Sequence, residues 1–406
     1  MIDLTLGQAN PKVEACEKSI HGESVGGQIA TYFKHQFALK PVIQQDPRTF
    51  SKVRKGLIVA QVGIAGMLGP LASTVYFPAL PTITADMNAS TTMVNATVSL
   101  FIMFMGIAPV FWASISDHYG IRRMLYLSSI AIFIGATIGC SFASNITLVL
   151  ILRCIQACGS SSLFSLGAGT IADCFAIHER GTAMSLLFLG QYLGPLLGPT
   201  IGGFLTSGFG WRATFWFCAI FASIILLVMF FTLPETYREE SQWPALPTDT
   251  TELNHKPECT VPSEITRVNN ATEIIIPESR SNLVSIPPKR MNPVASLGLL
   301  RHWFVVVVSI ETGISFGAMF TIETVLPELF TNTYGLNSAQ TGLTYLGAGF
   351  GNIFGSLVGG FFSDFFLRQA EKRRGGSNVP EDRLSLNMWI SGYLFLPGGI
   401  LLFGWS

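Results

Sequence analysis

The sequence predicts an all-α membrane protein in which a six-helix N-terminal bundle is followed by an incomplete, three-helix C-terminal bundle. Charged residues make up only 12% of the 406 residues, and the mean hydropathy is +0.46. A soluble domain carries about 25% charged residues, so this composition is that of a membrane protein. Nine segments are apolar over the roughly 20 residues that a membrane-spanning helix needs. Positive charge is concentrated in alternate connections between these segments, as expected of a multi-pass protein.

Short connections separate the apolar segments except at one place. A polar stretch, 1–55, precedes the first segment and lacks the pattern of a cleavable signal peptide, so we expect a cytosolic tail. Residues 234–301 are too polar to bury a core, which predicts a cytosolic, partly disordered linker. The N-terminal bundle then covers 56–233 and the C-terminal bundle 302–406. The expected helices are 57–80, 94–115, 124–143, 146–172, 182–207, 212–233, 303–330, 339–363 and 385–404.

The positive charges predict the orientation. Of the 25 Lys and Arg residues, 23 lie in the tail, the linker and alternate short connections, which would share one side of the membrane. The opposite connections, 81–93, 144–145 and 331–338, contain none. The positive-inside rule therefore puts the N-terminus in the cytosol. We expect the protein to reside in the plasma membrane, with the vacuolar membrane as the alternative location. The formal net charge of zero gives no indication of a nucleic-acid partner.

Two sequence features, a proline and an aspartate at the ends of apolar segments, recur in both bundles at nearly the same separation. Pro78 and Pro327, at the ends of the first and seventh segments, are 249 residues apart, and Asp117 and Asp364, at the ends of the second and eighth, are 247 apart. This predicts a duplicated unit joined by the linker. Because only three segments follow the linker, we expect the chain to be truncated.

The fifth segment carries glycines four residues apart, which lie on one face of a helix. In water such a helix would be poor, since each interior Gly costs about 1 kcal/mol and each Pro about 3 kcal/mol. Within a bilayer the helix survives and the smooth stripe lets another helix pack closely. We expect a bending, close-packed transport helix. Its residues are Gly190, Gly194, Pro195, Gly198, Pro199, Gly202 and Gly203.

The connection Ala113-Ser-Ile-Ser-Asp-His-Tyr-Gly-Ile-Arg-Arg123 resembles a motif of the major facilitator superfamily, in particular the fungal drug:proton antiporters with twelve transmembrane helices. The resemblance implies a major facilitator fold and a cytosolic latch that favours the outward-facing state. An aspartate beside two arginines can form such a latch through charge-assisted hydrogen bonds. Alternatively, the arginines only set the topology. The latch residues are Asp117, Gly120, Arg122, Arg123 and, from the second unit, Asp364.

The fourth and fifth segments are similar to further motifs of the family. Arg153 and Gln156 match a motif of the fourth helix, and with Ser160 and Gly167 they share one face that would line the central cleft. Alternatively, Arg153 extends to the outer interface. In the fifth helix the resemblance implies export rather than uptake, with the glycine stripe packed against the opposite bundle. Leu233-Pro-Glu-Thr-Tyr-Arg238, after the sixth segment, is also similar to the fungal branch.

A proton antiporter needs a carboxylate that titrates within the membrane. Many relatives have an acid in the first helix, but 57–80 contains none. We therefore expect Glu311 to bind the proton, whereas Glu323 and Glu328 are expected at the outer interface. With 31 phenylalanines, the cavity should be apolar and aromatic. The polar residues that could face it are Gln61, Asn95, Gln191, Tyr192, Tyr345 and Asn352.

The leading interpretation is a transporter that exports a drug, weak acid or secondary metabolite by proton antiport with alternating access. Its partners would be the small-molecule substrate, protons and the lipid bilayer, and the full-length protein would be a monomer. The alternatives are a facilitator or importer of the same fold, or a truncated membrane protein that does not transport. The sequence has no nucleophile–base pair, metal-ligand spacing or phosphate loop, so we expect no enzyme, metal or cofactor.

Overall fold

The computed structural model describes residues 46–175, 179–238, 298, 301–374 and 398. These residues form helices and turns, and no strand occurs among them. The tail 1–45, most of the linker and the expected ninth helix, 385–404, lie outside the described residues. The elements are η1 (Pro47–Thr49), α3 (Lys52–Gly66), α4 (Leu68–Thr74), η2 (Phe77–Ala79), α5 (Leu80–Asp86), α6 (Thr91–Tyr119), α7 (Arg123–Phe142), α8 (Ile146–Cys174), α9 (Arg180–Phe209), α10 (Arg212–Thr232), α11 (Trp303–Tyr334) and α12 (Ser338–Arg374).

The described helices confirm an all-α membrane protein. Six of them are long and apolar enough to cross a membrane, and α9 and α12 have 30 and 37 residues. Side-chain caps begin several of them: Ser90 accepts a hydrogen bond from the amide of Met93 at the start of α6, and Asn145 caps α8 in the same way. Gly120 ends α6 with a φ of 65°, a left-handed conformation that glycine adopts without strain.

The first crossing, Lys52–Asp86, is broken rather than continuous. Pro70 has no amide hydrogen, so the carbonyl of Gly66 loses its partner in the helix, and α3 ends there. A second break follows α4, where Tyr76 leads into the short 3₁₀ turn η2. The expected helix 57–80 is therefore a chain of short elements, α3, α4, η2 and α5, that begins at Lys52.

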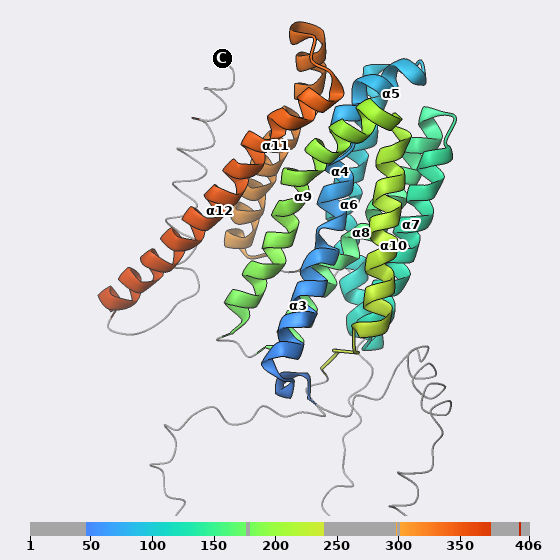
Figure 1. Cartoon of the computed structure of the whole chain (residues 1–406). Helices are drawn as coiled ribbons and strands as arrows, with labels where there is room; N and C mark the ends of the chain where they lie inside the picture. Colours follow the sequence, from blue (N-terminus) through green and yellow to red (C-terminus); the bar gives the residue numbers. More distant parts are fainter. Residues whose placement is uncertain (1–45, 176–178, 239–297, 299–300, 375–397, 399–406) are drawn as a thin grey trace, which may run out of the picture.

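The crossings run between two ends, which Figure 1 shows at the bottom and the top. The lower end carries the start of α3 and the α6–α7 turn, and the upper end carries α5 and the α9–α10 turn. Helix α8 packs against α6 and α7, and α7 packs against α10. Helix α9 packs against α3 and α4 on one side and against α12 on the other. Helices α11 and α12 stand beside this bundle in Figure 1.

Two hydrophobic clusters form the core. The larger lies within the first bundle and includes Val62, Ile130, Phe133 and Leu187. The smaller, which we call the upper cluster, joins the two units, since it includes Tyr345 of α12. The buried members of the upper cluster are Tyr76, Phe77, Ala79, Leu80, Ile83, Val94, Val98, Cys140, Trp211, Phe215 and Tyr345.

The recurring prolines of the two units lie in different local structures. Pro78 is in the 3₁₀ turn η2, whereas Pro327 lies inside the continuous helix α11. Both are buried. The two prolines of the predicted repeat therefore differ in local structure, because only Pro78 lies at a break in the helix.

Candidate functional site: a charged turn, a buried arginine and a glycine contact

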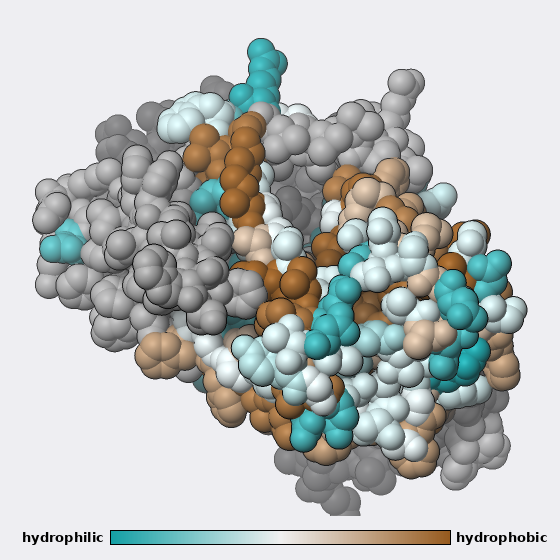
Figure 2. Space-filling model, turned by 90° about the horizontal axis from the view of Figure 1, so that it is seen from above, coloured by the Kyte–Doolittle hydropathy of each residue, from teal (hydrophilic) through white to brown (hydrophobic). Residues whose placement is uncertain are grey.

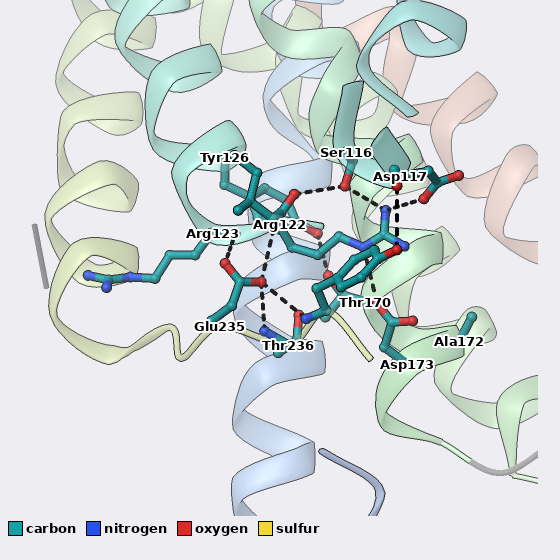
Figure 3. Close-up of polar contacts among 12 residues, drawn as sticks. Ser116, Asp117, Arg122, Arg123, Tyr126, Thr170, Ala172, Asp173, Glu235 and Thr236 are labelled. Atoms are coloured by element: carbon teal, nitrogen blue, oxygen red, sulfur yellow. Dashed lines mark hydrogen bonds and ion pairs between the residues drawn. The ribbon is translucent and has the colours of Figure 1, made fainter. Parts of the chain in front are cut away.

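Arg122 is the centre of a charged cluster at the lower end of the first bundle (Figure 3). Its guanidinium lies 3.3 Å from a carboxylate oxygen of Asp117 and 3.1 Å from one of Asp173, and it also donates to the Ser116 hydroxyl at 2.7 Å. Although burial lowers the pKa of Arg122, the charges of Asp173 and then Asp117 outweigh burial and raise it above its usual value. The arginine is therefore held charged between α6 and α8.

Glu235 fixes the same turn from the other side. Its carboxylate accepts the backbone amides of Arg122 and Arg123 at 2.9 and 3.2 Å, and those of Thr236 and Tyr237 at 3.0 and 3.1 Å. The first two amides belong to the start of α7, where a negative charge also stabilises the helix dipole. Residues 234–238, the first of the predicted partly disordered linker, are thus packed against the bundle.

The latch predicted from the sequence is only partly visible. The structure brings Asp117 and Arg122 together, and Gly120 makes the turn. Arg123 points away from them and donates to the carbonyl of Phe230 in the last turn of α10, at 2.7 Å. The sequence carries no signal that pairs Asp173 with Arg122, and the similarity of the segment around Glu235 to the fungal branch does not indicate a role for that residue. Asp364 lies on α12, but its side chain is outside the described residues, so its part in a latch stays a prediction.

A second ion pair joins the segment that precedes the first bundle in the sequence to the segment that follows it. Asp46 lies before α3 and Arg238 after α10, and the two side chains form hydrogen bonds of 3.1 and 3.2 Å. Burial raises the pKa of Asp46, but the hydrogen bonds from Arg238 and the Arg48 amide lower it below its usual 3.8 overall. The last residues of the expected tail are therefore attached to the bundle.

This ion pair predicts a pH dependence. A depressed pKa in the folded state means that the Asp46 carboxylate stabilises the fold above pH 3.8, and that this contribution disappears as the pH falls through the lower folded pKa. We expect Asp46→Asn to lower the free energy of unfolding by about 1 kcal/mol at pH 7, because solvent screens this partly exposed pair and reduces the contribution of its hydrogen bonds. Thermal unfolding of both proteins between pH 7 and pH 3 measures it. A difference that did not shrink at acid pH would contradict it.

Arg153 lies inside the first bundle and is fully buried, with 0% of its surface exposed. Its guanidinium donates to the carbonyl of Ala72 at 2.9 Å and to the Gln156 side chain at 3.1 Å, and it stacks between the rings of Tyr76 and Phe101 at 4.4 and 4.2 Å. Ala72 belongs to the last turn of α4, whose carbonyls have no partner in the helix. Arg153 therefore caps α4 where the first crossing breaks.

This position corrects two expectations. The side chain does not extend to the outer interface, and its face of α8 does not line an open cleft. Gln156 and Ser160 are also buried, and Gln156 donates to Thr137 of α7 at 2.7 Å. The physical reason is that the α4 carbonyl and the two rings offer Arg153 a cation site inside the bundle. No described carboxylate forms an ion pair with Arg153, and its Nε and second terminal nitrogen have no hydrogen-bond partner.

Four glycines of the α9 stripe, Gly190, Gly194, Gly198 and Gly202, pack on the first crossing, whereas Gly203 meets the opposite bundle, where the whole stripe was expected. A Cβ atom at Gly190 would overlap the backbone of Gly63, with its carbonyl carbon 2.7 Å away. One at Gly194 would lie 2.8 Å from the amide nitrogen of Leu71. Gly198 and Gly202 are equally close to Thr74 and Val75 of the same crossing. A stripe without side chains permits close packing but does not specify the partner helix, so the sequence could not distinguish the two.

The other edge of α9 contacts the second unit. Thr200 donates to the carbonyl of Gly342 at 3.2 Å. A Cβ at Gly203 would lie 3.1 Å from the Cα of Gly342, and one at Gly349 would lie 2.7 Å from the Cα of Leu196. Pro195 and Pro199 are buried in this part of α9, and the carbonyl of Pro199 faces Gly342. Helix α9 is thus packed between the first crossing and α12.

The remaining polar candidates do not meet at one site. Gln61 donates to Thr232 of α10 at 2.8 Å. Gln191 and Tyr192 are half-buried on α9, as is Asn352 on α12. Glu311 is half-buried in the lower part of α11. Asn95 lies near the upper end, on a pocket of about 230 Å³ between α5, α6 and α11. Figure 2 shows pale and teal polar residues over this upper end, with brown apolar residues around them.

The model of the Major Facilitator Superfamily matches residues 62–406, which include every crossing described above except the start of α3. The chain belongs to the Major Facilitator Superfamily. It is therefore an integral membrane protein with the helical fold of this superfamily. Among the described residues, no group of three His, Cys, Asp or Glu side chains could hold a metal ion.

The superfamily member is similar to several fungal proteins. It is 30% identical to "MFS-type transporter phiD" of a fungal species over 367 residues, covering 87% of this chain and 54% of that protein. It is 32% identical to "Citrate exporter 1" of Aspergillus niger, covering 80% and 60%, and 28% identical to "MFS antiporter QDR3" of Candida albicans, covering 89% and 65%. The chain thus spans between about half and two thirds of the length of these relatives.

One solved structure shows the same fold. A bacterial homologue of the human lysosomal transporter Spinster, in an inward-facing and unoccupied conformation, superposes with a TM-score of 0.55 at 17% identity. The match covers 79% of this chain and 64% of the other. At this identity the likeness supports the fold and not a shared substrate.

Proposed function

We propose that this superfamily member exports small organic molecules in exchange for protons, by alternating access. The observation that carries the proposal is the position of α9, packed backbone to backbone on the first crossing and also in contact with α12. A helix so placed transmits any movement of the second unit to the break that Arg153 caps. The names of relatives, a citrate exporter and an antiporter, favour export, and a weak organic acid is one substrate class.

The proposal includes an orientation. The lower end carries Arg122, Arg123 and the positively charged start of α3, so it would face the cytosol. The upper end, with the Asn95 pocket, would then face the outside or the vacuolar lumen. The Arg122 cluster would stabilise the state closed at the lower end and would break when that end opens.

The experiment is an efflux assay with the full chain in proteoliposomes. Vesicles loaded with radiolabelled citrate, or with a cationic aromatic compound, are diluted into buffer at pH 5.5 or pH 7.5. In the fraction of proteins whose lower end faces the vesicle interior, an acidic external buffer should accelerate release severalfold, because protons would then enter in exchange for the substrate. A release rate that is the same at both external pH values would indicate a facilitator. No release of either compound above protein-free vesicles would contradict transport of these two classes.

A further inference from the structure

The upper contact between the two units contains one buried acid. Glu323 of α11 has only 4% of its surface exposed, although none of the most apolar window of Val305–Tyr334 is buried. Among the α11 side chains that are described, only Glu323 and Pro327 are buried. This corrects the expectation of an outer-interface position for Glu323, whereas Glu328 is exposed as expected.

The residues around Glu323 belong to both units. Phe320 and Leu326, three positions away on each side, pack against the upper cluster. The hydroxyl of Tyr345 on α12 donates to the backbone carbonyl of Glu323. The ring centre of Tyr345 lies 6.3 Å from that of Phe77 in η2. The burial of Glu323 therefore depends on contact between η2 of the first unit and α11 and α12 of the second, which we call the upper seam.

The described side chains of the seam supply no positive charge to this carboxyl. Its Oε2 atom is buried without a hydrogen-bond partner. The elements packed on α11 are α5, η2 and α12, and their described side chains include no Lys, Arg or His. The ionisable groups of the upper cluster are Tyr76, Cys140 and Tyr345. Asp86, at the end of α5, is exposed, and its carboxylate accepts a hydrogen bond from the ring nitrogen of Trp211 at 3.0 Å. An ionised carboxylate buried there would lack compensation.

We propose that Glu323 is a proton-binding site that closes the upper seam. When the seam is open, water reaches the carboxyl and it exchanges protons with the upper side. When the seam closes, it keeps the proton, because the neutral acid can be buried and the carboxylate cannot. This inference deepens the proposed function, because it names the acid through which an external proton would favour closure of the seam after substrate release. It rests on the proposed function for the orientation of the upper end.

The test measures the seam directly, without transport. Hydroxyl radicals oxidise aromatic side chains according to their access to water, so Phe77 and Tyr345 report opening, while Phe133, buried in the first bundle, serves as the internal reference. The full chain in lipid nanodiscs is footprinted at pH 5.5 and at pH 8. A single linked proton can change the closing equilibrium by up to about tenfold per pH unit. We expect oxidation of Phe77 and Tyr345, relative to Phe133, to rise severalfold at pH 8.

Two variants test the residue. Glu323→Gln, a neutral mimic of the protonated acid, should keep the low oxidation of acid pH at both values, whereas the matched control Glu328→Gln, an exposed acid on the same helix, should respond like the wild type. If the Gln variant does not fold, Glu323→Leu, which is also neutral, takes its place and should likewise show the same low oxidation at both pH values. Oxidation independent of pH in the wild type, or an unchanged pH response in the neutral variants, would overturn the inference. A seam that responds in a protein without efflux would instead overturn only the proposed function.

Discussion

Gly190→Ala is expected to separate α9 from the first crossing and to destabilise the protein, although alanine is the better helix former. A Cβ at this position meets the backbone of Gly63, and a backbone cannot yield as the end of a flexible side chain can. Overpacking of this kind costs about 1–3 kcal/mol. Under the proposed function, efflux should fall with it, because α9 no longer follows the first crossing. Thermal unfolding in detergent and the efflux assay measure the two effects.

Gly208→Ala is the matched control on the same helix. Gly208 is exposed, and a Cβ there meets no atom within 4 Å. The same substitution should then be neutral or stabilise by up to about 1 kcal/mol through helix propensity. Opposite signs for the two variants would identify the close contact as the cause. Equal effects would contradict it.

Arg153→Met is expected to lower the rate of efflux about 100-fold with little change in stability. Methionine removes a fully buried charge that has no described ion-pair partner, and the desolvation of such an ion costs several kcal/mol. It also leaves the Ala72 carbonyl and Gln156 without their donor, at about 1–3 kcal/mol each. These terms oppose each other, so we expect the free energy of unfolding to stay within about 2 kcal/mol of the wild type.

Transport should respond differently from stability. If Arg153 holds the break of the first crossing during transport, the loss of two charged hydrogen bonds of about 1.5 kcal/mol each lowers the rate about 100-fold. The matched control is Arg212→Met, which removes an exposed arginine at the upper end of α10 and should leave efflux within about twofold. Arg153→Met with normal efflux, or with a large loss of stability, would contradict this account.

The helices could be predicted from the sequence because a membrane span is a local property of composition. Seven of the nine expected segments coincide with single described helices, and α7 and α8 agree with their expected bounds to within two residues. The breaks in the first crossing were missed, because a single Pro70 is often tolerated within a membrane helix and only the neighbouring helices decide whether it interrupts one.

The contacts of the candidate site were less predictable, because they join residues far apart in the sequence. The motif around Arg122 was recognised, but Asp173 and Glu235 approach it from α8 and from beyond α10. Likewise, the sequence places Glu323 near the end of a span, where exposure is the usual outcome. Only the packing of α11 on the upper cluster, with Tyr345 beside it, reveals that this acid is buried.

The ion pair between Asp46 and Arg238 brings together the entrance and the exit of the first unit. Six crossings are an even number, so the chain returns to the membrane face from which it started. A tandem copy of such a unit inserts in the same direction as the original, and a linker of almost any length can join the two on one face. A first unit whose chain ends meet at this salt bridge is therefore compatible with the predicted duplication, in which the two halves would be related by an axis along the membrane normal.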